Sequence, residues 1–277
     1  MGNEKFLSHR LNGFDTEESS LQGLKNASKA NIPYLEIDTR VSKDGVIYVN
    51  HDNFIKHQTG SISISHNSSV KIDNYIKKNN LKTIKLDLLL DVFSKRANRS
   101  QILMIDVKDY GFEQLHLNLV GKYNLQKNVI WVSWIPQTLI EIDKISPDST
   151  KILSFVPVND AFASITKNIT IKKIPFINVV LIGKDYFNKD LKNHAYGFQH
   201  AYLSAQLNQR LITLLAKNGG GVCISKKILT KNQLDFNKLH GLKTAVFSAQ
   251  DRNEYNALSK KGVDIIFCDF IDAQVVA

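Results

Sequence analysis

The chain has 277 residues, of which 43% are hydrophobic and 22% charged, proportions that are typical of a soluble globular protein. Its 36 lysines and arginines outnumber its 26 aspartates and glutamates, and the formal net charge of +10 suits an anionic partner. The basic residues are scattered and form no arginine-rich or aromatic-interleaved cluster, which argues against a nucleic-acid-binding protein.

The first predicted elements are a strand and a helix. Residues 5–9 form a short apolar run that predicts a strand, and residues 15–31 place leucines and alanines on one face, as in a helix. Asp15 is predicted to cap this helix, with Glu18 three residues later as in a capping box. Residues 34–40 predict the second strand.

The next apolar run, residues 46–51, follows the second strand after a turn at Asp44-Gly45. This connection is too short for a helical crossover, so we predict a hairpin-like excursion and not a regular parallel strand. Residues 58–80 are rich in serine, asparagine and lysine and predict a loop with one helical turn. Residues 85–98 predict a helix.

Strands and helices alternate along the rest of the chain. The least regular part is residues 157–220, which are too long for a single crossover and predict an insertion or lid. Within it, residues 175–183 resemble a strand and residues 206–217 a helix. The remaining strands are predicted at residues 101–107, 128–134, 151–156, 221–225, 243–248 and 263–268, and the helices at residues 112–123, 136–145, 229–239 and 251–261.

Without the excursion, this pattern contains eight strands of the βα type. Alternation of strands and helices indicates a parallel sheet covered by helices, and eight units in roughly 250 residues predict a (β/α)8 barrel. The alternative is an open doubly wound sheet, but no glycine-rich phosphate loop follows the first strand. Because no linker or repeat divides the chain, we expect residues 1–277 to form a single domain.

Cysteine usage and hydropathy bear on the location of the protein. Cys223 and Cys268 each lie in an apolar run, which is typical of buried free thiols in a reducing compartment. The longest apolar stretch, residues 174–182, is interrupted by Pro175 and Asn178 and is too short to cross a bilayer, and no signal peptide is visible. We therefore expect a cytoplasmic protein without stable membrane insertion, and the oligomeric state stays open.

Acidic side chains mark the second predicted strand. Glu36 and Asp38 are two residues apart, so their side chains share one face of the strand. Two carboxylates on one face repel each other unless a cation lies between them. Oxygen ligands favour a hard divalent ion, Mg²⁺ or Ca²⁺, over zinc.

Further charged or titratable residues stand at the ends of other predicted strands or runs. They are His9 and Arg10, then His51, and then Asp106 and Lys108. A single histidine at such a place is more often structural than functional. In a barrel, however, the carboxyl ends of all strands face one common pocket, so together these residues predict a site.

The order and spacing of these residues resemble those of the glycerophosphodiester phosphodiesterase family. The resemblance covers nearly the whole chain, and its first three blocks are highly specific. The matching blocks are His9-Arg10, residues 36–45 (EIDTRVSKDG), residues 49–52 (VNHD), Thr59-Gly60, residues 106–108 (DVK), residues 246–251 (VFSAQD) and residues 262–269 (GVDIIFCD).

The chain departs from the family pattern in three places. Leu11-Asn12 follow the His-Arg pair where the family usually has glycine, and Glu18-Ser19-Ser20 replaces its usual Glu-Asn-Thr. Asp106 stands where the family usually has glutamate. The spacings from His9 to Asn12 and from Asp106 to Lys108 are also similar to those of the sphingomyelinase D-type phospholipases. These departures leave the alcohol part of the substrate open.

The resemblance implies a metal-dependent phosphodiesterase of lipid metabolism. It would hydrolyse a small glycerophosphodiester-like molecule to an alcohol and a phosphomonoester such as glycerol 3-phosphate. Either histidine could be the general acid. The implied roles are metal binding (Mg²⁺ or Ca²⁺) for Glu36, Asp38 and Asp106, acid–base catalysis for His9 and His51, and phosphate binding for Arg10 and Lys108.

Two other readings stay open. One is a phospholipase D-like lipid phosphodiesterase at a membrane surface, and the other is a catalytically silent barrel that binds a phosphate ligand. Glu18 is expected to cap a helix or to pair with Arg10 and not to bind the metal. The remaining histidines are expected in loops or on the surface, at positions 57, 66, 116, 194, 200 and 240.

Overall fold

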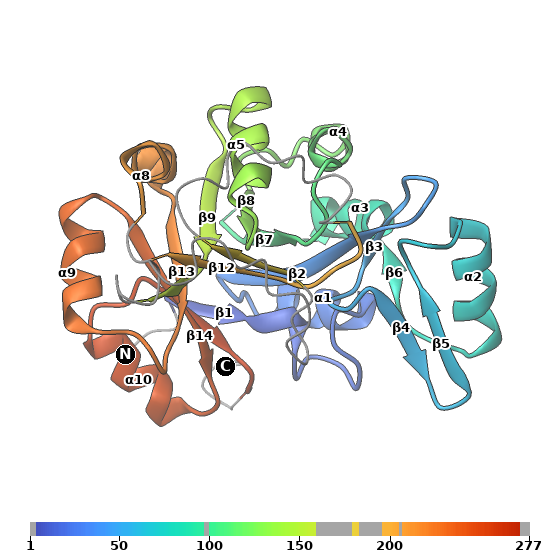
Figure 1. Ribbon diagram of the computed structural model, residues 1–277. Coiled ribbons are helices and arrows are strands. Elements are labelled where there is room, and N and C mark those ends of the chain that lie inside the picture. Colours follow the sequence, from blue (N-terminus) through green and yellow to red (C-terminus); the bar gives the residue numbers. More distant parts are fainter. Residues whose placement is uncertain (1–3, 97–99, 159–178, 183–195, 205–206, 272–277) are drawn as a thin grey trace.

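The computed structural model describes residues 4–96, 100–158, 179–182, 196–204 and 207–271. Its centre is a closed barrel of eight parallel strands in the order β1-β15-β14-β13-β9-β8-β7-β2, in which β1 also pairs with β2 (Figure 1). The predicted (β/α)8 architecture is confirmed. The barrel strands are β1 (Phe6–Ser8), β2 (Tyr34–Val41), β7 (Ile102–Val107), β8 (Val129–Ser133), β9 (Thr150–Ser154), β13 (Gly221–Ser225), β14 (Lys243–Ala249) and β15 (Ile265–Cys268).

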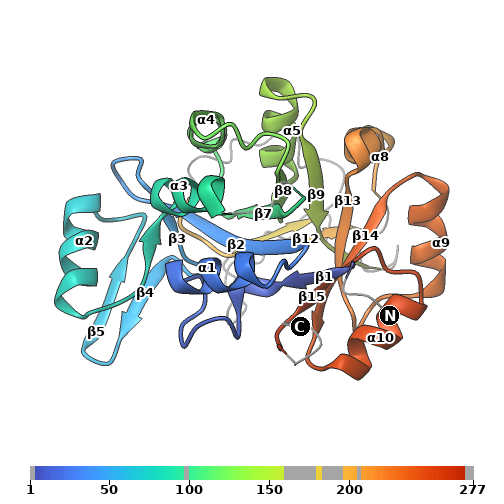
Figure 2. The ribbon, with the colours of Figure 1, turned by 180° about the vertical axis from the view of Figure 1, so that it is seen from behind.

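Helices surround the barrel, as Figures 1 and 2 show from opposite sides. One apolar cluster, which includes Phe6, Leu24 and Trp131, fills the space between strands and helices. A second cluster around Met104, Ile152 and Cys223 fills the barrel interior. The surrounding helices are α1 (Leu21–Lys29), α3 (Leu86–Arg96), α4 (Glu113–Lys122), α5 (Pro136–Ile145), α8 (Gln209–Ala216), α9 (Lys231–Leu239) and α10 (Arg252–Lys260).

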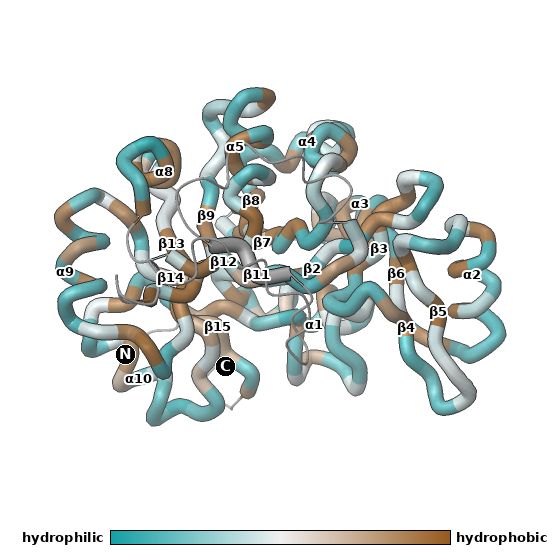
Figure 3. The backbone as a smooth tube through the Cα atoms, in the orientation of Figure 1, coloured by the Kyte–Doolittle hydropathy of each residue, from teal (hydrophilic) through white to brown (hydrophobic). Residues whose placement is uncertain are grey.

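The tube coloured by hydropathy shows the same division, with apolar barrel strands and mixed, largely polar outer helices (Figure 3). Both cysteines are buried free thiols, as predicted. Among the helices that the structure describes, none combines the length and the hydrophobicity needed to cross a lipid bilayer.

The first helix starts later than predicted. Ser20, and not Asp15, is the N-cap of α1, and its side chain accepts a hydrogen bond from the Gly23 amide at 2.9 Å. Ser19 has a left-handed conformation (φ 55°), which ends any helix that would begin before it. Asp15 instead accepts a hydrogen bond from the Ser20 hydroxyl at 2.6 Å, and thereby supports the cap.

The excursion after β2 is confirmed as a hairpin. Strand β3 (Ile47–Val49) pairs antiparallel with β2, and β6 (Ile84–Lys85) extends this edge. The prediction of a loop at residues 58–80 is wrong. Strands β4 (Phe54–His57) and β5 (Gly60–Ser63) form a second hairpin beside α2 (Ser69–Lys78).

This subdomain of β4, β5 and α2 lies outside the helix ring (Figure 1). Ile55, Ile64 and Ile72 form a small separate core there together with Tyr48 of β3. Because the apolar residues within 58–80, such as Ile64 and Ile72, stand between polar residues, the hydrophobic pattern of this range is weak, and the sequence alone predicted a loop.

The region after β9 contains a small parallel sheet in the order β10-β12-β11. It consists of β10 (Val156–Pro157), β11 (Val179–Ile182) and β12 (His200–Ser204), so the strand predicted within residues 175–183 is confirmed. The helix predicted at residues 206–217 is α8, which belongs to the regular barrel ring. Residues 159–178, 183–195 and 205–206 lie outside the described part, and so does His194.

Candidate active site

Three carboxylates meet at the carboxyl end of adjacent strands. Alternation along β2 places Glu36 and Asp38 on one face, and the parallel register pairs Asp38 with Asp106 of β7. One oxygen atom from each of the three side chains lies within 4.8 Å of the other two. None of the three residues is more than 6% exposed. Such a cluster of buried carboxylates needs positive charge beside it.

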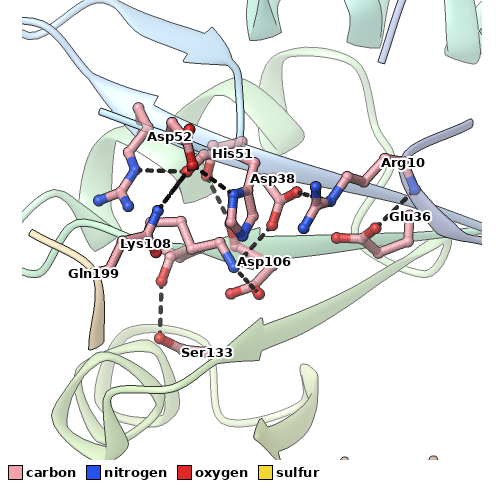
Figure 4. A network of polar contacts seen from close by, with 12 residues as sticks. Arg10, Glu36, Asp38, His51, Asp52, Asp106, Lys108, Ser133 and Gln199 are labelled. Atoms are coloured by element: carbon pink, nitrogen blue, oxygen red, sulfur yellow. Dashed lines mark hydrogen bonds and ion pairs between the residues drawn. The ribbon is translucent and has the colours of Figure 1, made fainter. Parts of the chain in front are cut away.

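Two basic side chains supply part of this charge (Figure 4). The Lys108 ammonium lies 2.8 Å from Asp38 Oδ1 and 2.6 Å from Asp106 Oδ2. The Arg10 Nε atom lies 3.1 Å from Asp38 Oδ2, and the Arg10 amide donates to Glu36 Oε2 at 2.9 Å. A further contact of Arg10, 3.6 Å to Glu18, confirms the expected pairing.

Lys108 and Arg10 do not affect the pKa values of the three carboxylates equally. Burial raises the pKa of Glu36 well above its usual value, and the neighbouring Asp38 raises it further. Burial also raises the pKa of Asp106, although Lys108 opposes this effect. Burial alone would raise the pKa of Asp38 too, but Lys108, His51 and Arg10 hold it well below its usual value. Glu36 and Asp106 are thus the carboxylates that would gain most from an additional cation.

The cluster fits a divalent metal ion. Asp106 Oδ1 is buried and has no hydrogen-bond partner, and Asp38 Oδ2 has only the 3.1 Å ion-pair contact with Arg10 Nε, which lacks hydrogen-bond geometry. Buried carboxylate oxygens normally have partners, and an unpaired one costs free energy. Three carboxylates with one oxygen atom each close together are the hard ligand set that Mg²⁺ and Ca²⁺ prefer.

Both predicted catalytic histidines border this cluster, and each ring is held by an aspartate. His9 Nδ1 lies 2.5 Å from Asp269 Oδ1, and His9 Nε2 is 4.0 Å from Glu36 Oε2. His51 Nδ1 lies 2.9 Å from Asp52 Oδ1. In both rings a hydrogen on Nδ1 would be donated to the carboxylate, which leaves Nε2 as the reactive nitrogen.

The environment of His51 disfavours its charged form. Burial is the main reason that the pKa of His51 falls to about 4, and the positive charges of Lys108 and Arg10 add to this effect. The ring is therefore neutral near pH 7 and able to accept a proton.

A tight turn brings Arg10 to the cluster. It forms the 3-10 turn η1 (His9–Leu11) directly after β1, in which Arg10 and Leu11 have φ angles of 53° and 56°. Left-handed backbone is uncommon for such side chains and requires support from the surrounding structure. Leu11 is fully buried in the core, and its packing holds the turn although glycine is absent.

A cavity of about 600 Å³ opens beside His51 and Lys108. The aromatic rings of Trp134 and Phe247, whose centroids are 5.7 Å apart, form part of its wall. Gln199 and the first two residues of β12, His200 and Ala201, also line the cavity. The cavity therefore lies beside Lys108, which contacts the carboxylate cluster, and has an aromatic wall.

The structure brings all seven predicted site residues together, but sequence reasoning missed several of their partners. Asp269 and Asp52, which hold the histidines, stood in matched blocks without a role. Arg40 and Asp109 form a buried ion pair at 3.0 Å, and Arg40 Nε also donates to the His51 carbonyl at 3.1 Å. The one feature of the sequence that could have pointed to these partners is a charged side chain in or next to an apolar segment.

The prediction that the remaining histidines lie in loops or on the surface is wrong for two of them. His116 is fully buried in α4, with its ring nitrogens 2.9 Å from the Phe112 carbonyl and 3.0 Å from Thr39 Oγ1. His200 is 9% exposed and lines the cavity. Tertiary packing covers both rings, which the local sequence does not reveal.

Comparison with known proteins places this geometry in a family. The model of the glycerophosphoryl diester phosphodiesterase family matches residues 8–273. The chain belongs to this family. Membership explains why the strand-end residues of β1, β2 and β7 converge, and it makes the chain a relative of enzymes that cleave phosphodiesters.

Curated relatives match part of the chain. Human lysophospholipase D GDPD1 is 25% identical over 138 residues, which cover 46% of this chain and 44% of the human protein. The glycerophosphodiester phosphodiesterase of Caldanaerobacter subterraneus subsp. tengcongensis is 22% identical over 151 residues, or 51% of this chain and 62% of that protein. The matches thus span less than two thirds of each relative.

Solved structures share the fold over nearly the whole chain. A phosphodiesterase from Oleispira antarctica, solved with its product sn-glycerol-3-phosphate, has a TM-score of 0.62 at 15% identity and covers 96% of this chain and 92% of its own. A glycerophosphodiester phosphodiesterase from Parabacteroides distasonis has a TM-score of 0.61 at 18% identity, with coverages of 97% and 93%.

Proposed function

We propose that the protein is a metal-dependent glycerophosphodiester phosphodiesterase. It would hydrolyse a small glycerophosphodiester to an alcohol and glycerol 3-phosphate, as a single catalytic domain of residues 1–277 in the cytoplasm. The observation that carries this proposal is the cluster of three buried carboxylates, with an unpartnered oxygen on Asp106, bordered by two histidines that each contact an aspartate.

The metal would be held by Glu36, Asp38 and Asp106. Mg²⁺ is slightly favoured over Ca²⁺ because only three protein carboxylates are available and Mg²⁺ readily keeps waters. When bound, the ion would withdraw negative charge from the non-bridging oxygens of the phosphodiester.

The other side chains would bind the phosphate and move protons. Arg10 and Lys108 would stabilise negative charge that develops on the phosphate. Reactive Nε2 atoms of His9 and His51 would take a proton from the attacking hydroxyl and give one to the leaving oxygen. If the substrate has a hydroxyl beside the ester, that hydroxyl would attack first and form a cyclic phosphate.

A second candidate is a lipid phosphodiesterase of the lysophospholipase D type. The cavity of about 600 Å³ beside His51 is far larger than a glycerol molecule needs, and Trp134 and Phe247 contribute apolar surface to it. Apolar lining suits an alcohol that carries an acyl chain. The partial match to human lysophospholipase D GDPD1 points in the same direction.

An activity panel distinguishes the two candidates. We would incubate the purified protein with Mg²⁺ and soluble glycerophosphocholine, glycerophosphoethanolamine or glycerophosphoinositol, or with lysophosphatidylcholine vesicles, and follow the products by ³¹P NMR. Turnover of the soluble diesters supports the first candidate, and turnover of the vesicles alone supports the second. If neither class is cleaved with Mg²⁺, Ca²⁺ or Mn²⁺, the protein is a binding barrel and both candidates are wrong.

A further inference from the structure

Asp269 holds a fixed place beside His9. Its backbone follows β15, and the parallel register that pairs Ser8 with Cys268 makes His9 and Asp269 the next residues on neighbouring strands. The Asp269 amide donates to the Ala249 carbonyl at 3.0 Å, so the backbone of this residue is anchored to β14 as well. The carboxylate therefore sits where three strands meet.

The two oxygen atoms of the Asp269 carboxylate have different hydrogen-bond partners. Oδ1 lies 2.5 Å from His9 Nδ1. Oδ2 accepts hydrogen bonds from the Ser248 hydroxyl at 2.5 Å and from the side-chain amide Nε2 of Gln250 at 2.7 Å. Two donors on Oδ2 prevent the carboxylate from rotating, so Oδ1 stays directed at the imidazole.

We propose that Asp269, together with Ser248 and Gln250, is a positioning device that fixes the tautomer and the orientation of His9. The proposal rests on the function proposed above. Because Oδ1 can only accept, the ring carries its hydrogen on Nδ1, and Nε2 keeps its lone pair toward the carboxylate cluster, 4.0 Å from Glu36. The Phe267 ring packs edge-on against His9, with centroids 5.5 Å apart, and holds the ring plane.

Asp52, the partner of His51, is more exposed to solvent than Asp269. The Asp52 side chain is 43% exposed and shares its carboxylate with Lys56, whose side chain is 71% exposed. The Asp269 side chain is 20% exposed, and its second oxygen is occupied by two partners. Removing the carboxylate at residue 269 should therefore affect its histidine more strongly than the same change at residue 52.

The variant Asp269→Asn has a particular expected effect. Ser248 and Gln250 both donate to the Oδ2 position, so the asparagine oxygen is favoured there and the amide NH₂ group turns to His9. Nδ1 must then accept a hydrogen bond from this NH₂ group, and the ring proton moves to Nε2. Nε2 then has no free lone pair with which to take a proton from the substrate. We expect kcat to fall by roughly 10²–10⁴-fold with little change in KM, the usual size of a lost acid–base group.

The tautomer gives a readout that does not depend on activity. Long-range ¹H–¹⁵N spectra of the histidine rings, with His9 identified from the His9→Ala spectrum, should show Nδ1–H in the wild type and Nε2–H in Asp269→Asn. The matched control is Asp264→Asn, since Asp264 precedes the same strand and accepts only from the Thr244 amide within the described contacts. This control should change neither the tautomer nor kcat.

The outcomes separate this proposal from the proposed function. A wild type without phosphodiesterase activity contradicts the function, while the ring spectra still decide the role of Asp269. An Nε2–H tautomer in the wild type overturns the proposal, and so does an Asp269→Asn variant that keeps either the wild-type tautomer or the wild-type kcat. If Asp269→Asn does not fold, Ser248→Ala and Gln250→Leu must each lower kcat without raising KM, or the proposal is wrong.

Discussion

Arg40 and Asp109 form an ion pair in which neither side chain is exposed, with 3.0 Å between Nη1 and Oδ1. Asp109 also accepts from the amides of Val41 and Gly197, both at 2.9 Å. Arg40 donates to the carbonyl groups of His51 and Phe198. The pair thus connects β2, the segment that carries His51 and the segment that leads into β12.

Removing one partner of this pair should destabilise the protein strongly. Arg40→Met leaves the Asp109 charge buried without compensation, and we expect the free energy of unfolding to fall by about 3–5 kcal/mol. Urea unfolding followed by circular dichroism measures this change. The control is Lys95→Met, because Lys95 pairs with Asp91 at 2.7 Å but its side chain is 68% exposed, so the loss should be below about 1 kcal/mol. Equal losses in both variants would contradict the structural role of Arg40.

Buried histidines should make the protein less stable at mildly acidic pH. Burial lowers the pKa of His116 to about 4, whereas histidine in an unfolded chain binds its proton near pH 6.5. Between these values the unfolded state binds more protons, so stability is fully present above pH 6.5 and is lost as the pH falls toward 4.

The variant His116→Gln isolates the contribution of this one ring. From pH 7 to pH 5 His116 should cost the wild type about 2 kcal/mol, in addition to the losses from His51 and His200, whose pKa values are also lowered by burial. The difference in unfolding free energy between the two pH values should therefore be about 2 kcal/mol smaller in the variant. An unchanged difference would show that His116 does not titrate as its burial implies.

The two histidines at the carboxylate cluster should be needed for turnover. We expect His9→Ala and His51→Ala each to lower kcat by roughly 10²–10⁴-fold, with a smaller effect on the binding of a substrate analogue. Steady-state kinetics with the best diester from the panel measure this. The control is His57→Ala on the outlying β4–β5 hairpin, which should leave turnover unchanged. Near-wild-type turnover in either test variant would make that histidine structural.

Asp106 should set the metal requirement. Its side chain is one methylene shorter than the glutamate usual in the family, and its Oδ1 atom has no hydrogen-bond donor. Asp106→Asn removes a charge that would compensate the metal, so the Mg²⁺ concentration for half-maximal activity should rise at least about tenfold, equivalent to 1.4 kcal/mol of binding energy. Asp106→Glu should keep substantial activity. The same Mg²⁺ dependence in Asp106→Asn and wild type would exclude Asp106 as a ligand.

The parts of the site that could be predicted from the sequence were those with a local signature. Glu36 and Asp38 share one face of a strand, and His9, His51 and Lys108 stand at the ends of apolar runs, so the expected barrel predicted a common pocket for them. Asp269 and Asp109 could not be given roles in this way. Each meets its partner only through the closed barrel, 260 residues away for His9 and 69 for Arg40.

The proposed function requires that this chain cleaves glycerophosphodiesters with a metal held by Glu36, Asp38 and Asp106. Its most direct test is ³¹P NMR of a soluble glycerophosphodiester incubated with the purified protein, first with Mg²⁺, then with excess EDTA, and then with Mg²⁺ restored. The proposed function predicts that the glycerol 3-phosphate signal grows, stops with EDTA and resumes with Mg²⁺. Release of glycerol 3-phosphate that continues at the same rate in EDTA would contradict it.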